Sequence, residues 1–296
     1  MTDQPSWLRP LQTSFSMLIK TPLISTKGVL QVDSDGAREA SFWFLLDPHA
    51  KAAKNGAFQY NRQFWFRIFS ILHQELPLTC DVMGHWNFNQ LALRAFSREH
   101  NDALHLPKSA NGISSFFIQC LHQKRENGRT LVSDLSPVVI ESLEFDACYL
   151  RIFGATDAVM TSEASVSNLL ETDESTESCQ LIAKGNWGIV RESWNLSDRF
   201  SRIKEPAQFR SDNLDNQTLK VLPEQRFLIM AANATSVQWV QIEGARAIFY
   251  EMLTRLPVGA AIDALLAQYA GPDVEQKAAT WLTESFEMGL WRQTLG

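Results

Sequence analysis

The last eighty residues, 217–296, constrain the fold most, because their apolar pattern changes from strand-like to helix-like part-way along. Three short segments have the length and apolar content of β-strands: Thr218–Leu222, Arg226–Ala231 and Ser236–Ile242. Three segments with apolar residues at helical spacing follow: Glu243–Arg255, Val258–Tyr269 and Val274–Met288. Prolines stand between these helical segments and interrupt them. The tail is therefore predicted to be a small α+β unit of three strands and then three helices.

The end of the last helix has its own signal. Gly289 fits the left-handed residue that terminates many helices, since glycine has no Cβ to clash in that conformation. The apolar Leu290 and Trp291 follow directly, as in caps whose next residues pack back on the helix. We expect Gly289 to close the last helix in this way.

The first half is predicted to be a helical domain, residues 1–154. Apolar residues recur at helical spacing in four segments: Trp7–Lys20, Tyr60–Leu72, Phe88–Phe96 and Ile113–Leu121. The second of these must end near Pro77. A fifth helix starts near Ser136-Pro137, where Ser can cap and Pro suits the first turn. Its expected buried face is formed by Val139, Leu143, Ala147 and Leu150.

A change of composition separates the two predicted domains. Residues 155–180 contain six acids and no Lys or Arg, and this segment alone accounts for the formal charge of −6 of the whole chain. Its Ser, Thr and acidic residues predict a linker or mobile loop, with a second domain at 181–296. Within that domain Leu181–Trp194 has a weak strand signal, and Ser197–Asn216 is polar and irregular.

Composition and motifs argue against several functions. A chain without a basic surplus lacks the charge that gives nucleic-acid binding most of its non-specific affinity. No basic start followed by an apolar run and no apolar stretch of membrane-spanning length is present, and four dispersed cysteines fit a reducing cytoplasm. There is no Gly-rich phosphate loop and no nucleophilic Ser elbow.

The histidines give no clear metal motif. All six lie in the helical half, and no two are four residues apart. A metal site there would need several of them to converge across helices with carboxylates. Surface or hydrogen-bonded histidines are the favoured interpretation, so no catalytic residue, metal ligand or cofactor is predicted.

The helical half resembles a known family. The residues that carry the resemblance are Tyr60-Asn61-Arg62, Leu76-Pro77, Gly84, Phe88, Leu91-Ala92 and Phe96, followed by Gly112–Phe117 and Leu135–Leu150 with its Leu143-Glu144. They are similar to the N-terminal domain of the HvfC, BufC and MbnC type of companion proteins, a family that carries a DNA-binding label. The similarity covers roughly Leu11–Phe153, and members commonly add a smaller C-terminal domain.

The resemblance implies a non-catalytic subunit. It would form a heterodimer with a multinuclear iron enzyme that modifies cysteines of a ribosomally made peptide, and would hold the leader of that precursor peptide. The tail resembles the winged-helix-like, PqqD-type element, in which the peptide adds as a strand beside the third strand and next to the third helix. Carried over by position, the peptide-binding residues would be Ser236, Gln238, Val240, Gln241 and Ile242 on the strand, with Lys277, Thr280 and Glu284 on the helix.

Two other interpretations stay open. The family label and the winged-helix order favour a DNA-binding regulator, but Asp273–Met288, the candidate recognition helix, carries four acids against Lys277 alone, a balance of −3. The tail would otherwise be a packed domain that mediates oligomerisation.

Overall fold

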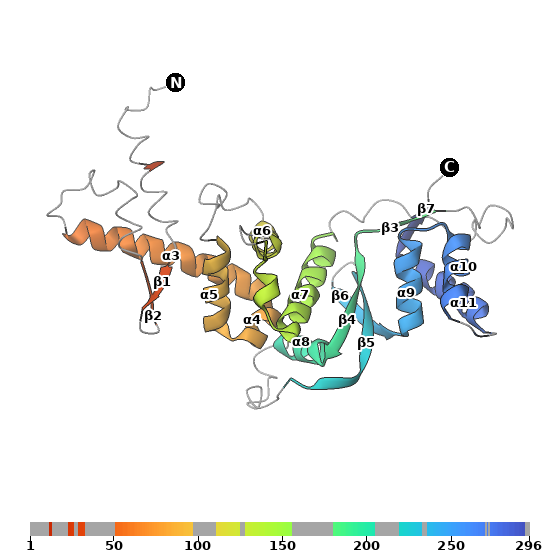
Figure 1. Cartoon of the computed structure of the whole chain (residues 1–296). Helices are drawn as coiled ribbons and strands as arrows, with labels where there is room; N and C mark the ends of the chain where they lie inside the picture. Colours follow the sequence, from red (N-terminus) through yellow and green to blue (C-terminus); the bar gives the residue numbers. More distant parts are fainter. Residues whose placement is uncertain are drawn as a thin grey trace, which may run out of the picture. The chain divides into compact units, whose positions relative to one another are not determined.

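The computed structural model describes residues 12–13, 23–26, 29–32, 51–96, 111–124, 128–155, 180–204, 219–232, 236–269, 271 and 273–293. These described parts are mostly helical, with a small three-stranded antiparallel sheet in the C-terminal part (Figure 1). The chain divides into two compact units, Met1–Val139 and Ile140–Gly296. The predicted helix at Trp7–Lys20, apart from residues 12–13, and most of the acidic segment 155–180 lie outside the described residues.

The helices of unit 1 follow the predicted apolar stripes. Their bounds are α3 (Lys51–Glu75), α4 (Pro77–Met83), α5 (His85–Phe96) and α6 (Asn111–His122), with a 3-10 turn at Val132–Asp134. The short hairpin of β1 (Leu23–Thr26) and β2 (Val29–Val32) precedes them and pairs in antiparallel register. The break before Pro77 is confirmed, since α3 ends at Glu75 and α4 begins with Pro77.

Aromatic side chains form the core of unit 1. Trp65 on α3 is fully buried, and its ring lies 6.0 Å from that of Phe69 and 6.2 Å from that of Phe96. Phe117 on α6 contacts both Phe96 and Phe88 at 5.7 Å between ring centroids. These rings bury large areas and prefer such tilted or edge-on contacts, so they hold α3, α5 and α6 together.

Unit 2 is built on an antiparallel sheet in the order β4-β5-β6. The strands are β4 (Trp187–Trp194), β5 (Val221–Ala232) and β6 (Val237–Ile242), and a separate pair joins β3 (Leu181–Ala183) to β7 (Trp291–Gln293). The first two predicted tail strands were wrong as separate elements, because β5 is continuous and contains Pro223. The weak strand signal before the tail is confirmed, and β4 supplies the sheet's remaining strand.

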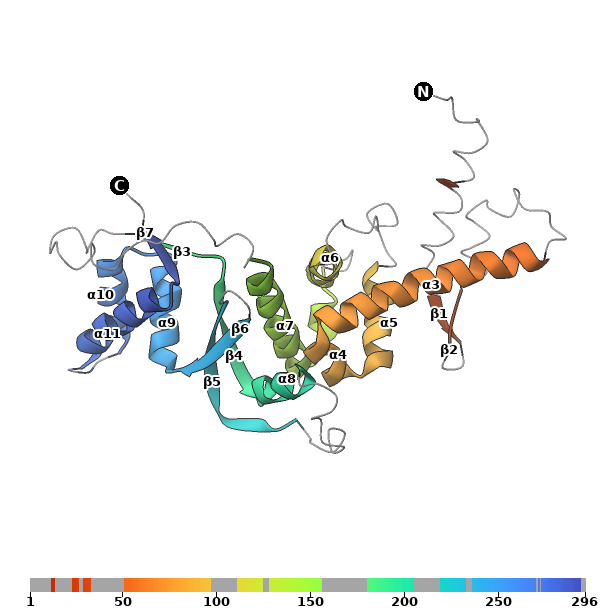
Figure 2. The same ribbon diagram turned by 180° about the vertical axis from the view of Figure 1, so that it is seen from behind.

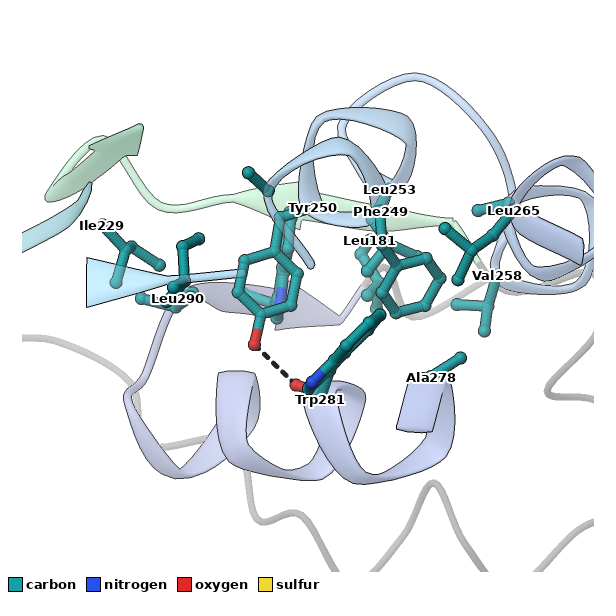
Figure 3. Packing of buried hydrophobic residues seen from close by; sticks show 14 of the residues in the cluster. Leu181, Ile229, Phe249, Tyr250, Leu253, Val258, Leu265, Ala278, Trp281 and Leu290 are labelled. Atoms are coloured by element: carbon teal, nitrogen blue, oxygen red, sulfur yellow. Dashed lines mark hydrogen bonds between the residues drawn. The ribbon is translucent and has the colours of Figure 1, made fainter. Parts of the chain in front are cut away.

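Helices cover both faces of this sheet (Figures 1 and 2). On one face lie α7 (Pro137–Ala155) and α8 (Leu196–Lys204), where the ring of Phe145 lies 5.1 Å from that of Phe200 and 6.1 Å from that of Trp239. On the other face lie α9 (Gly244–Leu253), α10 (Val258–Gln268) and α11 (Val274–Glu287). Figure 3 shows their core, in which Phe249, Tyr250 and Leu253 are fully buried.

Two assignments differ from the sequence expectations. The fifth helix, α7, was placed in a first domain ending at residue 154, whereas the compact units meet at Val139 and Ile140 because α7 packs on the sheet of unit 2. The segment predicted to be irregular begins with a helix, α8, whose buried residues are Leu196, Ser197 and Phe200. Among the described residues, no helix is long and apolar enough to cross a membrane.

Candidate functional site

The predicted peptide-binding strand, β6, lies at an edge of the sheet. It pairs with β5 on one side, with Val240 opposite Ile229 and Gln241 opposite Leu228. No strand in the described part of the chain pairs with its other side. An edge of this kind presents backbone N–H and C=O groups that another strand can use.

Three of the predicted strand residues are exposed. These are Gln238, Gln241 and Val240, and the Val240 side chain has 60% of its surface accessible. This exposure places an apolar group beside the open edge. Ser236, which precedes the strand, is half-buried.

Ile242 is the predicted residue that fits the site least. Its side chain is only 8% accessible and belongs to the hydrophobic cluster beneath α9. Because side chains alternate along a strand, Gln238 and Val240 project to the same face as Ile242, while Trp239 projects toward Phe145 and Phe200. Ile242 can therefore offer an added strand its backbone but not its side chain.

The predicted helix residues Lys277, Thr280 and Glu284 lie on one side of α11, and Lys277 is close to the end of β6. Nζ of Lys277 lies 3.6 Å from a carboxylate oxygen of Glu243, the residue that directly follows Ile242. Glu284 pairs with Arg246 of α9 at 2.6 Å, and the intervening Thr280 is exposed and donates its hydroxyl to the Gln276 carbonyl. The structure thus places Lys277 beside the residue that follows β6, whereas Glu284 pairs with α9 and Thr280 bonds within its own helix.

A buried polar contact fixes α11 against α9 in this position. The hydroxyl of Tyr250 donates to the carbonyl of Trp281 at 2.7 Å, as Figure 3 shows, and accepts from Nε of Arg246 at 2.9 Å. Burial raises the pKa of the Tyr250 phenol, with the nearby Arg246 opposing that shift, so the hydroxyl keeps its proton and can donate. The helix face beside the strand edge is consequently held in place by a satisfied buried hydrogen bond.

A second candidate site lies in unit 1 and was missed by the sequence reasoning. His73, Cys80 and His85 each offer one ligand atom, and these atoms lie within 4.8 Å of one another. His73 and His85 therefore converge across helices, but with a thiol rather than the carboxylates that the sequence reasoning required. His122 is exposed at the end of α6, and the remaining three histidines, His49, His100 and His105, lie outside the described residues.

His73 and His85 each have a hydrogen-bonding neighbour, as the interpretation of the sequence expected. Nε2 of His73 lies 2.8 Å from Oδ1 of Asn89, and Nδ1 of His85 lies 3.3 Å from Sγ of Cys80. Burial lowers the pKa of His73 from its usual 6.5, the hydrogen bond to Asn89 opposes this shift, and the neighbouring His85 lowers the pKa further. His73 is thus held in its neutral form near pH 7. The signal in the sequence is the spacing of the three residues across two chain reversals, at Leu76-Pro77 and at Gly84.

Comparisons with known proteins give no relative: no family model matches the chain, and no curated protein matches it. The resemblance to the HvfC, BufC and MbnC type of protein stays a prediction from the sequence.

Proposed function

We propose that this chain is a non-catalytic subunit that captures an extended precursor peptide along β6 and presents it to a multinuclear iron enzyme in ribosomal-peptide modification. The observation that carries the peptide-binding part is the open edge of β6, with exposed Gln238, Val240 and Gln241. The enzyme partner and the heterodimer come from the family resemblance of residues 11–153 and of the tail.

Strand addition suits the chemistry of this edge. A peptide lying antiparallel or parallel to β6 would satisfy the strand's outward backbone groups, which gives affinity that depends little on sequence. Side-chain preference would then come from Val240 on one face and Gln241 on the other, because the added strand alternates in the same way. An apolar residue beside Val240 and a polar residue near Gln241 are the expected preferences.

Charge favours a peptide over DNA at this site. The segment from Asp273 to Met288 has a balance of −3, and its one basic residue, Lys277, is already close to Glu243. A helix entering a DNA groove normally brings Lys or Arg for phosphates and base edges. A peptide needs no such surplus.

Proline substitutions in β6 test the proposal. Consecutive residues of a strand direct their N–H groups to opposite sides, so one of Val240→Pro and Gln241→Pro removes an outward N–H and leaves the ladder to β5 intact. Peptides selected from a random linear display library on the wild-type protein serve as the probe. We expect the proline variant that keeps its circular dichroism spectrum to bind them at least about tenfold more weakly, measured by fluorescence anisotropy.

Val221→Pro provides the matched control. Val221 is exposed, like Val240, but begins β5, and the first residue of a strand tolerates proline. Peptide affinity equal to that of the wild type is expected for this variant. Unchanged affinity in the folded β6 variant would contradict strand addition, and tight duplex binding in a gel-shift titration at low salt would favour the DNA-binding regulator instead.

A further inference from the structure

Three side chains of one short segment of unit 1 form a cluster of soft and borderline metal ligands. His73 lies in the last turn of α3, Cys80 lies in α4, and His85 is the first residue of α5. Their ligand atoms lie within 4.8 Å of one another. Thiolate and imidazole are the ligand types that zinc prefers in proteins.

The backbone brings the three residues together. α3 ends at Glu75, and Pro77 starts α4 in a new direction after Leu76, whose N–H still bonds the Leu72 carbonyl at 2.8 Å. Gly84 then has φ 76°, a left-handed conformation that glycine adopts without strain, and this residue turns the chain into α5. The cluster is thus built on helix ends and turns within one stretch of chain.

The distances match a tetrahedral zinc site that needs a small closing movement. Zn–S and Zn–N bonds of about 2.3 and 2.1 Å at the tetrahedral angle place sulfur and nitrogen about 3.6 Å apart. Sγ of Cys80 and Nδ1 of His85 are already 3.3 Å apart. The three ligand atoms lie at most 4.8 Å apart, which is roughly 1 Å more than a zinc site requires. A side-chain rotation can close this difference.

We propose that unit 1 binds one Zn²⁺ through Sγ of Cys80 and one ring nitrogen each of His73 and His85, with water as the fourth ligand. Binding releases the thiol proton of Cys80 to solvent, because the thiolate is the ligating form. His85 is exposed and gives the ion a path from solvent. On the inner side of the cluster Cys80 is 2% accessible and Phe88 is fully buried, so protein atoms shield the site from solvent there.

Asn89 gives the cluster the supporting contact that metal-binding histidines commonly have. Its amide oxygen accepts from Nε2 of His73 at 2.8 Å, so the lone pair of that ring is on Nδ1. Such hydrogen bonds fix the tautomer and the ring orientation of ligating histidines. Phe88 also contacts the His73 ring edge-on at 5.6 Å between centroids, which limits its rotation further.

A hydrogen bond between thiol and imidazole is enough to explain the contact between Cys80 and His85. It does not explain why the imidazole of His73 lies beside them. The ring of His73 lies 4.6 Å from that of His85, so two imidazoles and one thiol converge on the same point. A metal ion is the ligand that uses two imidazoles and a thiolate together. This inference is independent of the peptide-binding proposal, because it concerns different residues in a different unit.

The test uses the full-length protein, first stripped with a chelator. We expect one equivalent of Zn²⁺ to bind. Its affinity is measured by competition with a colorimetric chelator. Co²⁺ is expected to give thiolate charge-transfer absorption and the strong visible bands of a tetrahedral ion. His85→Ala, at an exposed position, should weaken binding at least about tenfold, and Cys80→Ser should abolish the charge-transfer band. Asn89→Ala should weaken binding by roughly tenfold while the stoichiometry remains one.

Two matched variants separate this site from other thiols and histidines. Cys148→Ser changes a cysteine of unit 2, and His122→Ala removes another exposed histidine of unit 1. Both are expected to bind Zn²⁺ and Co²⁺ as the wild type does. Absence of stoichiometric zinc in the wild type, or equal affinity in the wild type and His85→Ala, would overturn the proposal.

Discussion

Gly289 shows how one residue can fix the end of a helix. Its φ of 68° is left-handed, its N–H bonds the Phe286 carbonyl at 2.8 Å, and the next N–H, of Leu290, bonds the Ser285 carbonyl at 3.0 Å. This is the paired hydrogen-bond pattern of a Schellman cap. The predicted cap is confirmed, and so is the packing of Leu290 and Trp291, which are 0% and 2% accessible. The cap also aims the chain into β7, and the indole N–H of Trp291 donates to Ser285 Oγ at 2.8 Å.

The Gly289→Ala substitution tests this cap. A Cβ at a left-handed position costs about 1 kcal/mol, so we expect the free energy of unfolding to fall by about that amount in urea titrations. Gly271→Ala is the control, since Gly271 is not left-handed and its added Cβ would meet Val274 at an ordinary 3.4 Å. Equal losses in the two variants would show that the conformation of Gly289 is not what stabilises the cap.

At the scale of elements, a buried carboxylate connects β4 to α8. Glu192 is fully buried and accepts from the backbone N–H of Ser197 at 2.6 Å and from its hydroxyl at 3.0 Å. These bonds satisfy donors at the first turn of α8. Nη2 of Arg226 lies 3.2 Å from the other oxygen. Even so, burial raises the pKa of Glu192 above 4.5, with the Ser197 N–H, Arg226 and the Ser197 hydroxyl opposing and Asp198 adding to the increase.

This raised pKa predicts the pH dependence of a Glu192→Gln variant. A carboxyl group whose pKa is higher in the folded state contributes stability that is fully present below the unfolded pKa and lost as pH rises through the folded pKa. Glutamine resembles the protonated acid and does not titrate. We therefore expect Glu192→Gln to gain stability relative to the wild type as pH rises above about 4.5, measured by urea unfolding at several pH values.

Glu251→Gln provides the comparison for that series. Glu251 pairs with Arg191 at 3.3 Å, with both side chains substantially exposed, so its loss should change the free energy of unfolding by less than about 0.5 kcal/mol. If the free energy of unfolding of the wild type instead rose relative to that of Glu192→Gln with rising pH, the ion pair with Arg226 would outweigh the burial of the carboxylate.

Elements with strong local signals were predictable, and those set by tertiary contacts were not. The stripes of α5, α6 and α9–α11 and the left-handed Gly289 are visible in the sequence because period and glycine position are local properties. Pro223 suggested two strands, but β5 continues through it. The polar α8 is held largely by Phe200, and the cluster of His73, Cys80 and His85 depends on two chain reversals. Spacing alone does not give the direction of such turns.

At the scale of the whole molecule, α7 decides where the second unit begins. Phe145 and Tyr149 of α7 cover Phe200 of α8, with ring centroids 5.1 and 4.9 Å apart. Arg151 donates to the carbonyls of Gly185 and Trp187 at 3.2 and 3.0 Å, and Glu141 accepts from the N–H of Ser193 at 2.9 Å. Gly188 lets the strand approach closely, since a Cβ there would lie 2.7 Å from Sγ of Cys148. One part of the layer that covers this face of the sheet, the helix α7, therefore lies outside residues 181–296, and the other part, α8, lies within them.

Truncation tests whether residues 181–296 form a domain without α7. Removing the helix exposes Phe200 and one side of Trp239, and uncovering large apolar side chains costs about 1.5–3 kcal/mol each. Such a loss is a large part of the roughly 5–15 kcal/mol that stabilises a domain. We expect a fragment of residues 137–296 to unfold cooperatively, and a fragment of residues 181–296 to lose most of its near-ultraviolet circular dichroism. A synthetic peptide of residues 137–155 should restore that signal. Equal melting temperatures of the two fragments would instead place the boundary at residue 154 and leave β6 as the edge of a self-sufficient tail.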